Sequence, residues 1–127
     1  MKTIKIPYYT SSMDLHIEEK NLKAVISARI HELHVDRSEE QLVLAALENP
    51  IGAPRLRQLA KGKKKVTLVT SDHTRAVPSK VTLPLLLNEI RKGSPQAQIT
   101  ILIATGLHRA PTREEQRRMF GDRIVDH

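Results

Sequence analysis

The sequence of 127 residues contains no cysteine and no tryptophan, and only two tyrosines and one phenylalanine. Without cysteine, the chain has no disulfide framework, no thiolate metal site and no cysteine nucleophile. So few aromatic side chains offer no platform on which nucleic-acid bases could stack. No apolar run approaches the roughly 20 residues that span a bilayer, and residues 1–16 lack the apolar core of a signal peptide. These absences predict a cytoplasmic protein that binds neither nucleic acid nor a membrane.

Glycine-based and metal-binding motifs are also missing. The chain has only five glycines, and it contains no G-x-G-x-x-G, no P-loop and no G-x-S-x-G motif. His31 and His34 have a spacing that could bind a metal, but no third ligand is apparent and HExxH is absent. We therefore predict no metal site in this chain.

Positive charge is in excess, with 21 lysines and arginines against 14 acidic residues and a net charge of +7. This excess suggests an anionic partner, but it does not choose between nucleic acid, phosphate and carboxylate. The basic run at 55–65, "RLRQLAKGKKK", is more simply interpreted as a solvated helix end and loop before a strand.

The second half of the chain has the pattern of an α/β fold. Residues 65–70 and 98–106 are apolar strands, and helices are expected over 79–93 and from Thr112 onward. Near-continuous apolar strands alternating with helices predict a parallel strand–helix–strand core with both faces covered, a Rossmann-like arrangement of three layers. The length suits one domain, so we expect residues 1–127 to form a single α/β domain.

Local signals add an N-terminal β-hairpin and several helix ends. Residues 2–9 and 13–17 alternate as paired strands do, whereas residues 20–35 fit either helix or extended chain. Capping boxes at Ser38 to Gln41 and at Thr112 to Glu115 predict helix starts. A short helix is expected between Pro54 and Gly62, and Pro84 suggests that the 79–93 helix starts later than Ser79.

Polar side chains follow both predicted parallel strands at the point where each strand ends. "SDHTR" (71–75) leaves the first strand and "TGLHR" (105–109) leaves the second. In parallel α/β sheets ligands bind beyond the carboxyl ends of the strands, so Asp72, Arg75 and His108 could face one pocket.

Each of these residue types has a chemical use. Arg75 could grip a carboxylate or phosphate with two hydrogen bonds. Asp72 could orient Arg75 or accept hydrogen bonds from a ribose. His108 could move a proton near neutral pH, and Gly106 allows close approach of a ligand.

A purely structural interpretation of the same residues stays open. Asp72 could simply form an Asx-turn or helix cap paired with Arg75, and a histidine after a glycine is often incidental. His73 is expected to point away from its neighbours. Arg109 is expected at the surface or facing a phosphate.

The two loops resemble the signatures of a known family. "TSDHTRAVPS" (70–79) and "ILIATGLHRAPTREE" (101–115), joined by a helix of this length, are similar to the nickel-pincer lactate racemases. The resemblance extends to "IPYY" near the start, to 47–66 and to the closing "FGDRIVDH".

This resemblance implies an isomerase that interconverts the D and L forms of a 2-hydroxy acid such as lactate, using a nickel-pincer nucleotide as hydride acceptor. It makes His108 a general acid/base and Arg75 the group that holds the substrate carboxylate. Asp72, Thr74 and Gly106 become cofactor-binding residues. Ala76 departs from the proline usual in the family, which should loosen the loop without removing a chemical group.

The resemblance also implies that much of the enzyme is absent from this chain. In the family, the lysine that links the cofactor, the nickel-ligating histidine and a second catalytic histidine all lie downstream. We expect residues 1–127 to be an N-terminal fragment that is inactive alone, binds no cofactor alone and partners the remainder of the racemase. One alternative is a standalone α/β module that binds a small anion or a nucleotide phosphate, and another is a nucleic-acid-associated protein that uses the basic run at 55–65.

Overall fold

The computed structural model describes residues 1–126, with every side chain among them except that of His31. His127, and the pairing of His31 with His34 considered above, lie outside the described residues. The chain divides into two compact units, Met1–Val35 and Asp36–His127, and we describe each by itself. The single-domain organisation stays a prediction.

The first unit is built on a β-hairpin. Strand β1 (Lys2–Tyr8) pairs antiparallel with β2 (Ser11–Ile17), as the alternating pattern predicts. The stretch that fitted either helix or extended chain has only two single turns of 3₁₀-helix, η1 (Glu19–Asn21) and η2 (Ile30–Glu32).

The second unit begins with two helices whose ends follow local rules. Helix α1 (Glu39–Glu48) starts at Ser38, whose hydroxyl accepts a hydrogen bond from the Gln41 amide at 3.2 Å. The Gln41 side chain accepts one from the Ser38 amide at 2.9 Å, so the predicted capping box is present. Helix α2 (Leu56–Ala60) follows within the range expected for the short helix.

A parallel strand–helix–strand unit follows, as predicted. Strand β3 (Lys65–Ser71) pairs in parallel with β4 (Gln98–Ala104), and α3 (Ser79–Gly93) connects them. The expected late start of α3 is wrong, because the helix begins at Ser79 and carries Pro84 within it. Pro84 has no amide hydrogen, so one hydrogen bond of the helix is missing. Burial of Leu83 and Ile90 in the same helix offsets this loss and stabilises the continuous helix. Helices α4 (Arg113–Phe120) and α5 (Asp122–Val125) complete the chain.

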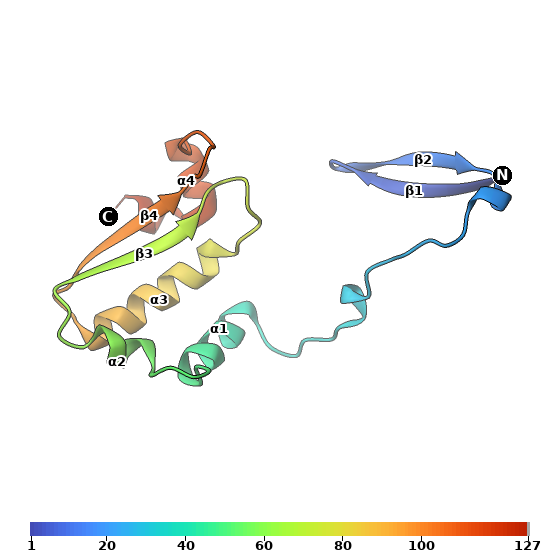
Figure 1. The fold of residues 1–127 in the computed structure, drawn as a ribbon. Coiled ribbons are helices and arrows are strands. Elements are labelled where there is room, and N and C mark those ends of the chain that lie inside the picture. Colours follow the sequence, from blue (N-terminus) through green and yellow to red (C-terminus); the bar gives the residue numbers. More distant parts are fainter. Residues whose placement is uncertain (127) are drawn as a thin grey trace. The chain divides into compact units, whose positions relative to one another are not determined.

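Helix α3 lies along one face of the two-stranded sheet (Figure 1). On that face the strand residues are partly buried, as with Leu68 and Ile101. On the opposite face the paired residues Val69 and Leu102 are 67% and 53% exposed. The expectation of two covered faces is therefore wrong for the described residues, and a three-layered, Rossmann-like arrangement is not established. Apolar and β-branched residues occupy both faces of the strands, so composition alone does not distinguish the covered face from the open one.

Helix α2 packs closely on the end of α3. A Cβ atom added at Gly93, the last residue of α3, would overlap the carbonyl oxygen of Arg57 in α2. Glycine here permits an approach between two backbones that any other residue would obstruct. This contact holds the chain segment just before β3 against the helix that follows it.

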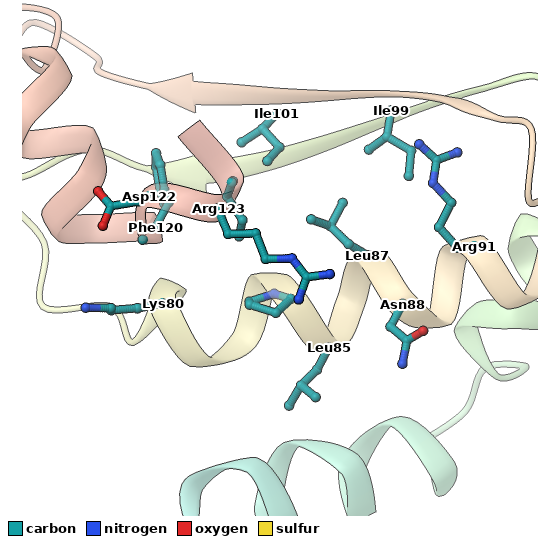
Figure 2. A pocket seen from close by; sticks show the side chains of 13 residues that line it. Lys80, Leu85, Leu87, Asn88, Arg91, Ile99, Ile101, Phe120, Asp122 and Arg123 are labelled. Atoms are coloured by element: carbon teal, nitrogen blue, oxygen red, sulfur yellow. The ribbon is translucent and has the colours of Figure 1, made fainter. Parts of the chain in front are cut away.

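An open groove of about 1090 Å³ lies between α3, β4 and the α4–α5 segment (Figure 2). Leu87, Ile99, Ile101 and Phe120 give it an apolar lining, and charged side chains, including Lys80 and Arg123, also line it. None of the loop residues considered for function lines it. Among the described residues, no helix combines the length and apolar character needed to cross a membrane.

Candidate active site

The two polar loops start at the same edge of the parallel sheet. Ser71 and Ala104 are register partners at the last positions of β3 and β4, so the residues that follow them begin side by side. Asp72 comes directly after Ser71 and is buried, with 2% of its surface exposed. His108 lies four residues beyond Ala104 and keeps 46% of its side chain exposed.

A tight turn presents His108 to Asp72. The His108 amide donates to the carbonyl of Thr105 at 3.0 Å, and Gly106 within this turn has a φ of +58°. Glycine adopts this left-handed conformation without strain, whereas other residues rarely do. A Cβ atom at Gly106 would meet nothing within 4 Å, so the backbone there is open to a ligand.

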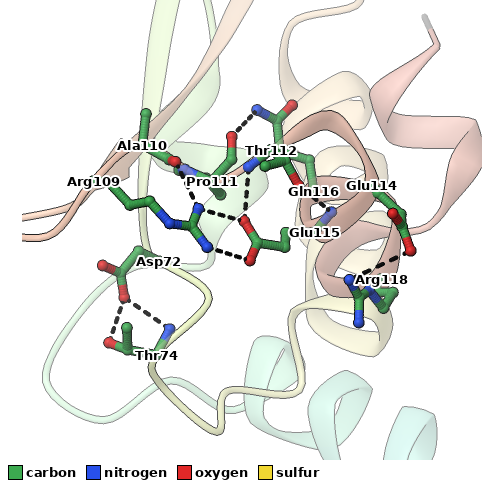
Figure 3. A network of polar contacts seen from close by, with 10 residues as sticks. All are labelled: Asp72, Thr74, Arg109, Ala110, Pro111, Thr112, Glu114, Glu115, Gln116 and Arg118. Atoms are coloured by element: carbon green, nitrogen blue, oxygen red, sulfur yellow. Dashed lines mark hydrogen bonds and ion pairs between the residues drawn. The ribbon is translucent and has the colours of Figure 1, made fainter.

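The two oxygens of the Asp72 carboxylate have different partners. Oδ1 accepts hydrogen bonds from the Thr74 hydroxyl at 2.7 Å and from the Thr74 amide at 3.0 Å (Figure 3). Oδ2 lies 2.7 Å from Nδ1 of His108. The hydrogen bond from the Thr74 amide forms the Asx-turn that the sequence suggested. The same carboxylate also contacts His108 in the second loop.

These contacts keep Asp72 ionised. The hydrogen bond from the Thr74 hydroxyl is the largest of several effects, with the His108 and Thr74 amide hydrogen bonds, that together lower the pKa of Asp72 from 3.8 to about 2 against the opposing effect of burial. An ionised carboxylate only accepts hydrogen bonds, so Nδ1 of His108 must carry the proton in this contact. In neutral His108 that leaves Nε2 as the unprotonated nitrogen, available to take a proton.

Arg75 lies beside this pair but does not complete an Asp–Arg pair. Its backbone amide donates a hydrogen bond to the Asp72 carbonyl oxygen at 3.3 Å. The residue itself is exposed. In the described part of the chain, the Asp72 carboxylate forms its side-chain hydrogen bonds with Thr74 and His108 instead. The guanidinium of Arg75 therefore stays available to an external anion.

Arg109 is held by a partner that sequence reasoning missed. Its guanidinium donates to both carboxylate oxygens of Glu115, at 2.7 and 2.8 Å, as Figure 3 shows. Glu115 also accepts from the Thr112 amide at 2.8 Å in the predicted capping box of α4. The Arg109 hydrogen bonds, aided by the Thr112 amide, lower the pKa of Glu115. The capping box was the available sequence signal for this contact. A glutamate that caps a helix start can accept hydrogen bonds from the cap amide and also from an arginine in the preceding loop.

His73, the neighbour of Asp72, takes no part in this network. It is partly buried, and its Nδ1 atom is buried without a hydrogen-bond partner among the described residues.

The described residues do not offer a nickel site. No three His, Cys, Asp or Glu side chains of the described part gather closely enough to hold a metal ion. Asp72 is buried and its oxygens accept three hydrogen bonds, so its geometry favours orienting His108 over contacting a cofactor. A nickel cofactor would need ligands from outside these residues.

A buried carboxylate that hydrogen-bonds an exposed histidine at the edge of a parallel sheet is an arrangement suited to proton transfer. Residues 8–127 match the family described as the lactate racemase N-terminal domain. The chain belongs to this family.

Two curated relatives are named lactate racemase. One, from Thermoanaerobacterium thermosaccharolyticum, is 46% identical over 126 residues, and the other, from Lactiplantibacillus plantarum, is 38% identical over 126 residues. Each match covers 99% of this chain and 30% of the relative. The solved structure of the T. thermosaccharolyticum lactate racemase apoprotein is similar with a TM-score of 0.85 at 44% identity, over 99% of this chain and 28% of that one.

Proposed function

We propose that this chain supplies one wall of the active site of a 2-hydroxyacid racemase, with lactate as the model substrate. The carrying observation is the 2.7 Å contact between Asp72 and His108 at the shared edge of β3 and β4. Membership of the lactate racemase N-terminal domain family supports the reaction class. A cytoplasmic location belongs to the same proposal.

His108 is the proton-transfer group in this proposal. Its Nε2 atom takes the proton of the substrate hydroxyl, and the ionised Asp72 stabilises the positive imidazolium that results. The planar 2-keto acid then regains a hydride on either face of its carbonyl carbon, and the same nitrogen returns the proton to its oxygen. The resemblance to the racemases implies that a nickel-pincer nucleotide, which residues outside this chain would hold, would supply the acceptor and donor for the hydride of the substrate Cα.

Arg75 holds the substrate in this proposal. A guanidinium binds a carboxylate through two parallel hydrogen bonds, which fixes both position and orientation. Arg75 lies three residues after Asp72 and is exposed, so it can reach a substrate beside His108. The space beside the Cα atom of Gly106 is open, and we propose that the cofactor contacts the backbone there.

The remainder of the site comes from elsewhere. The chain spans 30% of the length of its curated relatives, and the open face of the sheet exposes the apolar pair Val69 and Leu102. We use "parent racemase" for a chain that joins residues 1–127 to the further length present in those relatives. In it, we propose, the added segments cover this face and contribute the cofactor ligands.

A racemisation assay tests the proposed function. The nickel-loaded parent racemase should convert L-lactate to the racemic mixture, followed by chiral chromatography, whereas residues 1–127 alone should give no conversion and retain no nickel. The chain alone lacks a nickel donor set among its described residues. Stoichiometric nickel on residues 1–127, or a parent racemase without activity on any 2-hydroxy acid, would refute the proposal.

Replacing Arg75 with lysine should weaken substrate binding. Lysine keeps the charge but loses the planar fork, so KM for lactate should rise by about tenfold while kcat changes little. Steady-state kinetics on the parent racemase measure both values. Arg118→Lys is the matched control, because Arg118 is an exposed arginine paired with Glu114 at 3.4 Å, outside the site. A KM within twofold of wild type would remove Arg75 from the substrate site.

A further inference from the structure

Thr74 contributes two separate hydrogen bonds to the Asp72 carboxylate. Its amide hydrogen bond, at 3.0 Å, forms the Asx-turn that shapes the loop. Its hydroxyl hydrogen bond, at 2.7 Å, ends on the same Oδ1 oxygen (Figure 3). The turn needs only the amide, which every residue except proline provides, so the hydroxyl has an effect that the turn does not explain.

The hydroxyl constrains the direction in which the carboxylate faces. The terminal torsion of an aspartate is soft and roughly two-fold, so a single hydrogen bond leaves the carboxylate plane free to turn. With Oδ1 bound to two donors of Thr74, the other oxygen is directed at Nδ1 of His108, 2.7 Å away. Oγ1 of Thr74 also lies 3.4 Å from this Nδ1 atom.

We propose that Thr74 is a positioning residue, whose hydroxyl holds the Asp72 carboxylate so that His108 keeps its proton on Nδ1 and exposes a free Nε2. This inference rests on the proposed function, in which Nε2 is the atom that takes the substrate proton. It gives Thr74 a role different from the cofactor contact that the family resemblance implies. Thr74 acts on the reaction through Asp72 and His108.

Valine in place of Thr74 isolates the hydroxyl. Thr74→Val keeps the β-branched shape and the amide, so the Asx-turn can persist, and it removes only the hydroxyl donor. Nitrogen-15 NMR of the chain of residues 1–127 then reports the tautomer of neutral His108. The wild type should be mainly Nδ1-protonated, and the valine variant should gain a clear Nε2-protonated population. Carbon-13 titration of Asp72 should show its pKa rising from about 2, because the strongest stabiliser of the charged form is lost.

Kinetics of the parent racemase give the second readout. Thr74→Val should lower kcat by about tenfold with little change in KM, and Thr74→Ser, which returns the hydroxyl, should recover most of the loss. Thr10→Val is the matched control, since Thr10 is an exposed residue of the turn between β1 and β2 in the first unit. Nickel content separates the roles, because a positioning residue leaves it unchanged, whereas a cofactor contact would lower it.

The outcomes distinguish this inference from the proposed function. A valine variant with the wild-type tautomer and wild-type kcat overturns the positioning role, and so does a variant that loses nickel while its tautomer is unchanged. A shifted tautomer in a protein whose parent shows no racemisation supports the positioning role and refutes the proposed function. If the valine variant is less stable, the serine variant still tests the inference, because it should retain the wild-type tautomer.

Discussion

Replacing His108 with alanine should remove most of the turnover of the parent racemase while the fold stays intact. A positioned acid/base side chain contributes roughly 10²–10⁴-fold to a rate, so kcat should fall within that range. The fold should tolerate the change because 46% of the His108 side chain is exposed and its turn is closed by its own backbone amide. Racemisation kinetics and circular dichroism of the same preparation check both expectations.

A histidine of the first unit provides the comparison for that experiment. His16 lies on β2 in the first unit and contacts the Thr3 hydroxyl at 3.0 Å, so His16→Ala should leave kcat close to wild type. If His108→Ala retained activity within about threefold of wild type, the loss would be too small for an acid/base catalyst. The site would then have to transfer its proton through another group.

Replacing Asp72 with asparagine should have the second largest effect. Asparagine has almost the same shape and can remain buried, but it carries no charge to stabilise the imidazolium of His108. Its amide can also donate to Nδ1, which would leave the proton of neutral His108 on Nε2. We expect kcat to fall by roughly 10²-fold or more, toward the full acid/base contribution. Nitrogen-15 NMR should show the changed tautomer in the same variant.

The acid stability of the chain gives an independent test of this substitution. Because the folded-state pKa of Asp72 is about 2 against an ordinary 3.8, its ionised form stabilises the fold above about pH 4. That contribution should disappear as the pH falls through about 2. The free energy of unfolding of Asp72→Asn should therefore vary less with pH over this window than that of the wild type. Asp122→Asn is the control, because Asp122 is exposed and lies outside the site. An asparagine variant with unchanged turnover and an unchanged pH profile would contradict the role of Asp72.

The parts of the fold that depend on local rules could be predicted from the sequence. Ser38 with Gln41 and Thr112 with Glu115 identify two helix starts, because a capping box involves only residues three positions apart. The parallel pairing of β3 and β4 follows from two apolar strands separated by a helix. The open face of the sheet could not be predicted, since Val69 and Leu102 have the same apolar character as the buried strand residues. Pro84 misled the prediction of the α3 start, because packing of the helix outweighs one missing hydrogen bond.

The position of the candidate site at the sheet edge could be predicted from the sequence, whereas most of its contacts could not. Topology alone brings Asp72 and His108 to one sheet edge. It does not determine which partner Asp72 selects, because Arg75 and His108 were both plausible and only the geometry of the turn decides between them. The bidentate contact of Arg109 with Glu115 was missed for the same reason, as it depends on how the loop meets the start of α4.

The carboxylate of Asp72 accepts hydrogen bonds from residues at very different separations in the sequence. Thr74 binds it from two residues away, and His108 binds it from 36 residues away. The first contact can form in a short peptide. The second requires β3 to pair with β4, although the whole of α3 separates them in the sequence. A slip of one residue in that pairing would turn every side chain of a strand to the opposite face and would carry His108 away from its partner. The proposed proton-transfer role of His108 therefore requires a correctly registered sheet, and the hydrogen bond between Asp72 and His108 forms only when β3 and β4 are paired in that register.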